Sequence, residues 1–349
     1  MATFHFASAL WLVRSHKPTI GIIMKGKFLL FCCFIALKLF AQNDSTGNAS
    51  ASNQPKKKKW PGDETALRIF YGQRLINAKT VEVLPKGSMA FTVVHTFGDV
   101  AGENGGTYTF FGLDEVSDAQ IGFQIGVGNR LNVLLQHTVG NDKGGAPRHY
   151  WEAGLKYKFL QQATDGSPIS LTAFGNIVSC AERIPQDSTG AVIPGFENSF
   201  VSDGDRLSEL FQLMVARRFG NVSLQISGTY LHTHLVIPGD QNDLLSIGAA
   251  VRIPITQSVF IISDYFHSFR NEESKETWES KGQTPRDVFG IGVEILTAGH
   301  VFHLNFTNAR NILENRFLPR TTDQWSEGQF RWGFTLARNF GLFKVKNKK

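Results

Sequence analysis

The sequence contains very little cysteine, and most of it lies near the N-terminus. Only 3 of its 349 residues are cysteines. Cys32 and Cys33 lie in a segment that we expect to be removed, so the mature chain keeps Cys180 alone. One cysteine cannot form an intramolecular disulfide, and it cannot build a cysteine-based metal site.

The sequence also lacks an apolar run long enough for a transmembrane helix. Its main apolar run, residues 28–37, follows a basic start at Met24 and ends near a small residue, Ala41. This pattern is typical of a secretory signal peptide, and the run is too short to span a bilayer. We therefore predict that residues 1–41 are a signal peptide whose true start is Met24. An exported membrane protein without apolar helices has to be a barrel.

Charged residues are scarce as well, at 19%, and the net charge of +6 is concentrated at the ends of the chain. Residues 1–41 hold five basic residues and no acidic one, which leaves 31 Lys and Arg against 30 Asp and Glu. Two further groups of four lysines lie at 56–59 and in the tail at 344–349, so the middle of the chain is acidic. This distribution argues against a nucleic-acid-binding surface.

What the sequence has in abundance is phenylalanine and glycine, 29 and 34 residues. Near the C-terminus, Phe330, Trp332, Phe334 and Leu336 alternate with polar or small residues. A period of two is typical of a β-strand with one apolar and one polar face. Such a strand fits a soluble sandwich, and it equally fits a wall with lipid outside and a polar lumen inside.

Similar alternation recurs along the chain and predicts about twelve strands. Three of the segments, 88–97, 169–179 and 258–268, alternate less clearly, so their inward and outward faces stay open. The predicted strands are 88–97, 118–127, 130–139, 149–159, 169–179, 207–219, 221–232, 243–253, 258–268, 286–296, 300–309 and 328–340.

Short and long connections alternate between these segments, which a soluble sandwich has no reason to show. Short turns on one rim and long loops on the other are typical of up-and-down outer-membrane barrels, whose short turns face the periplasm. We therefore predict an all-β transmembrane antiparallel barrel of about 12 strands. The predicted organisation is signal peptide 1–41, disordered periplasmic linker 42–66, barrel 67–341 and basic tail 342–349.

The two faces of the clearer strands predict which side chains meet the lumen and which meet lipid. Inward charges indicate either a selective passage or a ladder of structural ion pairs in a closed barrel, and the two readings stay open. The candidate lumen-lining residues are Glu152, Lys156, Lys158, Arg218, Arg252, Glu294 and Arg331. The candidate lipid-facing residues are Trp151, Tyr157, Phe289, Phe302, Phe306, Phe330, Trp332 and Phe334.

The chain resembles a known family, and the segments "HTFGD", "FGLD" and "IGVGNRLNV" are the most specific part of the resemblance. Over about residues 70–340 it resembles an uncharacterised outer-membrane β-barrel family of Bacteroidota, a domain of unknown function. The resemblance implies an outer-membrane barrel and brings no activity or catalytic residue. The last strand resembles the C-terminal insertion signal of such barrels, ending on Phe340 or Phe343.

Enzymatic chemistry has little support in the sequence. Asp264 and His267 are three residues apart, so a regular strand places them on opposite faces. His232 and His234 at a strand end are a weak metal candidate, and no Ser-His-acid grouping has a recognisable spacing. We predict no catalytic, cofactor-binding or metal-binding residue. The aromatic loop "FFGLDEV" can fold inward as a plug, although a surface loop is the simpler expectation.

These observations lead to an expected function. The chain is expected to be a porin-like pore or passive transporter for small polar solutes in the outer membrane of a Gram-negative bacterium. The alternatives are a closed barrel that binds a partner through its long loops or periplasmic side, and a rim-active hydrolase. The expected partners are outer-membrane lipid, the barrel-assembly machinery and a small polar solute or periplasmic protein, with no nucleic acid and no cofactor.

Overall fold

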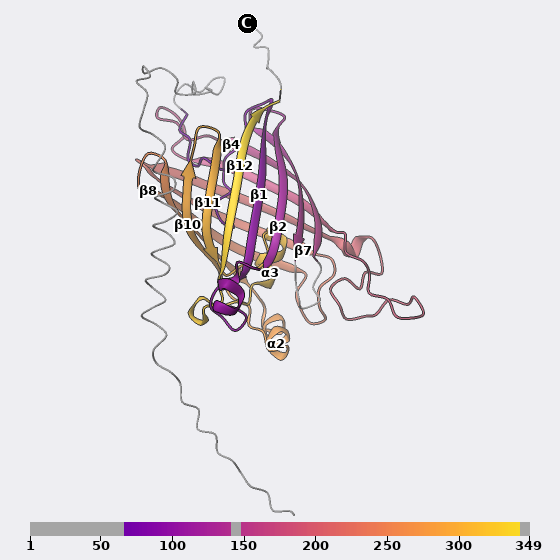
Figure 1. The fold of residues 1–349 in the computed structure, drawn as a ribbon. Coiled ribbons are helices and arrows are strands. Elements are labelled where there is room, and N and C mark those ends of the chain that lie inside the picture. The colour runs from indigo at the N-terminus through magenta and orange to yellow at the C-terminus, as the bar shows by residue number, and fades with distance from the viewer. Residues whose placement is uncertain (1–65, 141–147, 343–349) are drawn as a thin grey trace, which may run out of the picture. The chain divides into compact units, whose positions relative to one another are not determined.

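The computed structural model describes residues 66–140 and 148–342. Twelve antiparallel strands close into one barrel, because β1 pairs with β12 as well as with β2. The predicted fold class is thereby confirmed (Figure 1). The strands are β1 (Ser88–Asp99), β2 (Val116–Gly126), β3 (Leu131–Gly140), β4 (His149–Leu160), β5 (Ser170–Cys180), β6 (Leu207–Phe219), β7 (Val222–Thr233), β8 (Asp243–Pro254), β9 (Val259–Phe269), β10 (Val288–Leu296), β11 (His300–Thr307) and β12 (Arg331–Gly341).

The connections lie alternately at the two rims of the barrel. Those of one rim are 127–130, 161–169, 220–221, 255–258 and 297–299. Those of the other rim are 100–115, 141–148, 181–206, 234–242, 270–287 and 308–330, and they carry η1 (Thr107–Gly112), η2 (Gly204–Arg206), α2 (Glu272–Ser280), α3 (Glu314–Arg320) and η3 (Trp325–Glu327). We call the two rims the short-turn end and the long-loop end. In the described part of the chain, no helix is long and apolar enough to cross a membrane.

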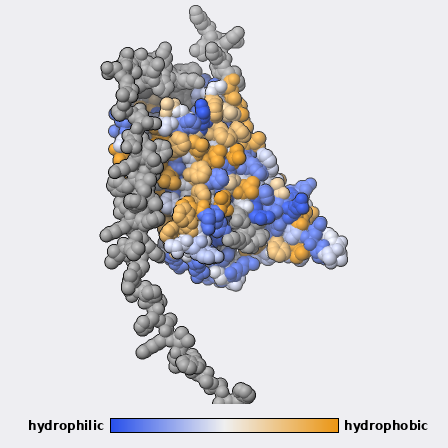
Figure 2. All heavy atoms as spheres, viewed as in Figure 1, coloured by the Kyte–Doolittle hydropathy of each residue, from blue (hydrophilic) through white to orange (hydrophobic). Residues whose placement is uncertain are grey.

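The barrel wall has its apolar side chains outside and its polar ones inside. On β4, Trp151, Leu155 and Tyr157 are exposed, whereas Glu152 and Lys156 are buried. Figure 2 shows apolar residues spread over the visible wall and hydrophilic ones towards the long-loop end. This arrangement inverts that of a soluble protein and suits a wall with hydrocarbon outside.

The lumen is filled by two segments that enter from opposite ends. Residues 67–86, which precede β1, form a hairpin with a turn at Ile76 and Asn77, and we call them the inner hairpin. From the long-loop end, α3 folds back into the barrel, with Phe317 fully buried. Apolar side chains of both segments pack with inward wall residues such as Phe174 in one core.

A closed barrel in which every strand edge is paired should resist unfolding by detergent, because no backbone row is left open. We therefore expect unheated protein to migrate faster than boiled protein in a denaturing detergent gel. Equal mobility of the two samples would contradict a detergent-resistant barrel.

Candidate functional site: a plugged lumen

The turn of the inner hairpin is held by one carboxylate of the wall. Asp264 on β9 accepts hydrogen bonds from the backbone N–H groups of Ile76 (3.2 Å), Asn77 (2.6 Å) and Ala78 (2.8 Å). The Asn77 side-chain amide donates a fourth, at 2.8 Å. Because the turn and Asp264 are buried, these bonds satisfy groups that water does not reach. Asp264 therefore fixes how far the hairpin reaches into the barrel.

Polar side chains of the wall also pair with the main chain of the second hairpin leg, which follows the turn. Asn132 pairs with both Leu84 N (2.6 Å) and Leu84 O (2.9 Å). Gln225 pairs with Val81 N (2.9 Å) and Lys79 O (2.7 Å). Each amide side chain supplies one donor and one acceptor, as a neighbouring strand would. The inward polar residues thus act as partners of the hairpin backbone.

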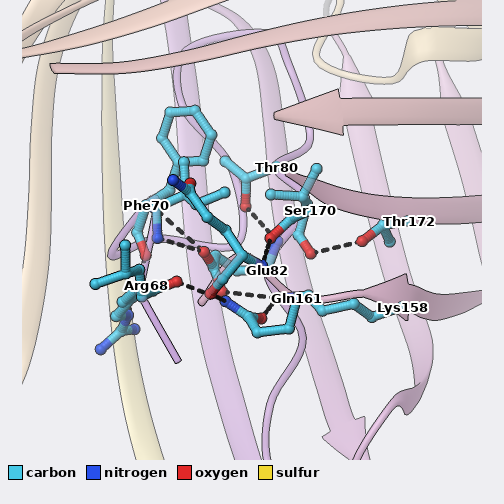
Figure 3. A network of polar contacts seen from close by, with 12 residues as sticks. Arg68, Phe70, Thr80, Glu82, Lys158, Gln161, Ser170 and Thr172 are labelled. Carbon is cyan, nitrogen blue, oxygen red and sulfur yellow. Dashed lines mark hydrogen bonds and ion pairs between the residues drawn. The ribbon is translucent and has the colours of Figure 1, made fainter. Parts of the chain in front are cut away.

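Glu82 ties the two hairpin legs to the wall near the short-turn end. One of its oxygens accepts from the N–H groups of Ile69 (2.9 Å) and Phe70 (3.1 Å). The other lies 3.1 Å from Lys158 Nζ on β4. Lys158 also donates to Gln161 at 2.6 Å, and Figure 3 shows Glu82 between Phe70 and this pair. A buried carboxylate is stable here because each oxygen has a donor.

Lys79 joins the hairpin to both the wall and α3. Its Nζ lies 2.7 Å from Glu314 Oε2 on α3 and 3.2 Å from Glu152 Oε1 on β4. The ammonium also stands 4.5 Å from the centre of the Phe174 ring. The side chains of Lys79, Glu152 and Glu314 are almost fully buried. One cation therefore connects three segments that are far apart in the sequence.

The α3 segment is held by inward residues at the long-loop end. Ile312 N donates to Asp118 at 2.7 Å, and Ile312 O accepts from Arg74 of the hairpin at 2.7 Å. Asn315 accepts from Asn176 at 3.0 Å and donates to Ser208 at 3.1 Å. The two inserted segments therefore contact each other as well as the wall.

Six of the seven predicted lumen-lining residues are buried in the barrel. Glu152 and Lys158 bind the hairpin as described, and Arg331 pairs with Asp323 of the β11–β12 connection. Arg252 Nε lies 2.5 Å from Glu294, whose second oxygen is 3.0 Å from His303. Lys156 is fully buried, and within the described residues its Nζ has no hydrogen-bond partner.

Arg218 lies elsewhere, at the short-turn rim. It is half-buried, and its guanidinium donates to Gly220 O (2.8 Å) and Asn221 (3.2 Å) of the β6–β7 turn. The end of a strand beside a two-residue turn is open to solvent, so this side chain folds over the turn. Arg218 therefore lines the mouth of the barrel instead of its interior.

Two wall glycines leave room for the hairpin. A Cβ at Gly126 would collide with the carbonyl oxygens of Pro85 and Leu84. A Cβ at Gly290 would come within 2.8 Å of both Asn77 Nδ2 and Ile76 Cγ2. Glycine is needed here because the hairpin backbone approaches the wall closely.

The predicted lipid-facing residues lie on the outer side of the strands or just before them. Trp151, Tyr157 and Phe302 are exposed. The others are half-buried because they pack together near the long-loop end: Phe306 lies 4.1 Å from Trp332 and 5.7 Å from Phe330 between ring centres. Phe289 and Phe334 belong to similar contacts with Trp325 and His95. Contact of these rings with lipid stays a prediction.

The structure does not bring the candidate catalytic side chains together. Asp264 points into the lumen, whereas His267 lies outside and its Nδ1 is 2.8 Å from Asp287. His232 and His234 are also outside, paired with Asp243 and Glu209. Among residues 66–140 and 148–342, no three His, Cys, Asp or Glu are placed to hold a metal ion. The "FFGLDEV" loop is at the surface, with Phe110 exposed.

Sequence reasoning missed the inner hairpin, which it counted as part of the barrel segment. Residues 67–86 have no period-two alternation, and they mix apolar side chains with Arg74, Lys79 and Glu82. Two of the three strand segments with unclear faces, 169–179 and 258–268, carried a signal for it. They place Phe174, Phe260 and Phe266 inward. Phe260 packs on Tyr71, and Phe266 packs on Phe317.

Comparison with solved structures finds other barrels at low sequence identity. A NanC porin is 6% identical with a TM-score of 0.42, over 74% of this chain and 100% of that one. A KdgM porin is also 6% identical with a TM-score of 0.42, over 72% and 99%. The COG4313 outer membrane channel from Pseudomonas putida F1 is 14% identical with a TM-score of 0.42, over 74% and 98%. No curated protein matches the sequence.

A known protein family covers both the barrel and most of its inner hairpin. Residues 70–340 match the family described as "Membrane bound beta barrel domain (DUF5777)". The match begins at residue 70, within the inner hairpin, and so includes most of that segment. This chain belongs to the DUF5777 family of membrane-bound β-barrel domains.

Proposed function

We propose that this membrane barrel is a plugged pore, which passes a small polar solute passively when the inner hairpin leaves the lumen. The observation that carries the proposal is the path of the hairpin. One leg reaches the β4–β5 turn, where Leu67 N donates to Gln162 O, and the other ends where Gly87 N donates to Gly126 O. Both legs therefore reach the short-turn end, and the hairpin can withdraw without being threaded through the barrel.

The groups that hold the hairpin are suited to reversible release. Asn132, Gln225 and Asp264 bind its backbone through hydrogen bonds, which water can replace once the lumen opens. A withdrawn hairpin would leave a passage lined by amide, carboxylate and ammonium groups. Such a lining favours a small polar solute over an apolar one.

The proposed location is the outer membrane of a Gram-negative bacterium of the Bacteroidota. Outward aromatic and aliphatic side chains would contact lipid there, and the barrel-assembly machinery would insert the chain through its aromatic last strand. Short turns face the periplasm in such barrels, so the hairpin would withdraw towards the periplasm. A periplasmic protein is then a suitable partner for drawing it out.

A second candidate is a permanently closed barrel that binds a partner through its long loops or its periplasmic side. The packing of Phe70, Leu75 and Val81 in the lumen core favours it, because that apolar surface would be wetted on withdrawal. We propose no enzymatic role, since Asp264 holds the hairpin and His303 is engaged by Glu294.

Replacing the carboxylate that holds the hairpin turn tests the proposal. Asp264→Ala leaves the N–H groups of Ile76, Asn77 and Ala78 without their acceptor, and each unsatisfied buried group costs about 1–3 kcal/mol. Since 1.4 kcal/mol is a factor of ten, we expect the open probability in planar bilayers to rise at least ~10-fold. Single-channel recording at several voltages measures this rise.

The matched control is His267→Ala on the outer face of the same strand, which should leave the open probability at the wild-type value. Heat-dependent gel mobility confirms that each variant forms a barrel. If the Asp264→Ala variant folds as a barrel and its open probability equals that of the wild type, the result favours the permanently closed barrel.

A further inference from the structure

We propose that Glu152, Glu314 and the acceptors around them form a binding site for a primary ammonium cation, which Lys79 occupies while the barrel is closed. The inference deepens the proposed function and rests on it in one respect: a solute can reach the site only when the hairpin withdraws. It names the solute class as small molecules that carry a primary amine.

The contacts of Lys79 have the form of a ligand in a site. Its ammonium lies between two carboxylates, 2.7 Å from Glu314 and 3.2 Å from Glu152, and above the face of Phe174. Carboxylate oxygens and an aromatic face are the groups that bind ammonium ions in proteins. The carboxylates belong to α3 and β4, whereas the cation belongs to the hairpin.

The site has more acceptors than the Lys79 ammonium uses. Glu152 Oε2, Asn176 Oδ1 and Gln212 Oε1 are buried and have no hydrogen-bond partner within the described residues. They belong to the same network, because Asn176 donates to Glu152 Oε1 at 2.8 Å and Gln212 Nε2 lies 3.5 Å from Glu314 Oε1. Glu152 itself is only 1% exposed. Unmatched buried acceptors are costly, so they point to a ligand with donors to spare.

The other hairpin ion pair is the internal comparison. Lys158 Nζ lies 3.1 Å from Glu82 Oε2, and the other oxygen of Glu82 accepts from Ile69 N and Phe70 N of the hairpin. One carboxylate suffices to neutralise one buried lysine. The second carboxylate at Lys79 also faces Arg74 of the hairpin, whereas the unmatched acceptors are more than a structural ion pair needs.

The charge left behind by the hairpin supports a cationic ligand. Arg74 is the other cation that the hairpin brings to this level, where it donates to Gln120 at 3.2 Å and Ile312 O at 2.7 Å. Withdrawal removes both Arg74 and Lys79 and leaves three carboxylates, Glu152, Glu314 and Asp264, with one buried wall lysine, Lys156, beside them. A solute ammonium would replace Lys79 there, and its binding would in turn favour the open state.

Chemical rescue tests the site in the full-length protein. Lys79→Ala removes the tethered ammonium and should lower the Tm of the detergent-solubilised barrel, followed by tryptophan fluorescence. Methylammonium chloride should restore the Tm, with a rise that follows the logarithm of its concentration above the Kd. Tetramethylammonium chloride at equal ionic strength should not, because it has no N–H donor.

Matched variants separate the site from a general effect of amines. Lys79→Ala/Glu314→Gln, which also removes one of the two carboxylate charges, should lack the methylammonium response. An equal response in Lys79→Ala and in this double variant, or no response in Lys79→Ala, would overturn the proposal.

A second measurement keeps Lys79 in place in case its truncation prevents folding. In an Ala78→Cys/Cys180→Ser variant, methylammonium should compete with Lys79 and speed labelling of the thiol at position 78 by a water-soluble reagent, whereas tetramethylammonium should not. A labelling rate independent of methylammonium would then overturn the site. Neither measurement needs current through the barrel, so amine binding in a barrel that never conducts would reject the pore alone.

Discussion

A barrel in which a Gly/Ser linker of equal length replaces residues 68–84 is expected to conduct ions steadily in planar bilayers. These residues include the hairpin turn, the cations Arg74 and Lys79, and the apolar side chains that reach the lumen core. A flexible polar linker cannot rebuild those contacts, because it has neither apolar surface nor fixed turns. With α3 alone in the lumen, water should fill the short-turn half of the barrel.

The measurement is single-channel conductance of the variant against the wild type, which should be closed for most of the time. The control replaces residues 185–195 of the exposed β5–β6 connection by the same kind of linker and should conduct like the wild type. A hairpin-less barrel that shifts in gel mobility yet passes no current would reject the hairpin as the gate.

The strands of this protein could be predicted because lipid-facing walls impose a strict period of two. Each predicted segment matches an observed strand to within three residues at either end. The alternation is clear in segments such as 149–159, where outward Trp151 and Leu155 are apolar and inward Glu152 and Lys156 are charged. A strand with hydrocarbon on one side and polar groups on the other needs alternating apolar and polar residues, so few other sequence patterns fit it.

The plug could not be predicted, because its contacts join residues with no regular spacing. Asp264 holds a turn that lies nearly two hundred residues earlier, and Lys79 meets Glu314 from the other end of the chain. Inward charges on the strands are equally compatible with water and with an inserted segment, since either can satisfy them. The sequence therefore predicted the wall and left the state of the lumen open.

Apolar residues at inward positions were the signal that was available. Phe260, Ile262 and Phe266 interrupt the polar inward face of β9, and they are buried against the inserted segments. A water-filled lumen gives no reason for such residues, whereas a plug does. The run from Ile312 to Leu318 in an otherwise polar connection has the same explanation, because α3 buries Leu313, Phe317 and Leu318. Apolar residues on the inward face of a strand thus indicate where apolar side chains of the inserted segments pack.

Loss of the Glu294 carboxylate is expected to have the largest effect on stability among single substitutions of the wall. Glu294 is fully buried and lies between Arg252, at 2.5 Å, and His303, at 3.0 Å. His303 Nδ1 in turn lies 3.1 Å from Leu75 O of the hairpin. Glu294→Ala leaves a buried guanidinium without its counter-charge, which typically costs about 3–5 kcal/mol.

Denaturant unfolding in detergent micelles, followed by tryptophan fluorescence, measures this loss as a lower midpoint. The control is Glu209→Ala, which removes a carboxylate from the outer face, where Glu209 Oε1 lies 3.1 Å from His234 Nε2. Both partners there are more than a third exposed, so we expect a change of only ~0–1 kcal/mol. Equal midpoints for the two variants would mean that water reaches Arg252 and that the short-turn half of the lumen is already open.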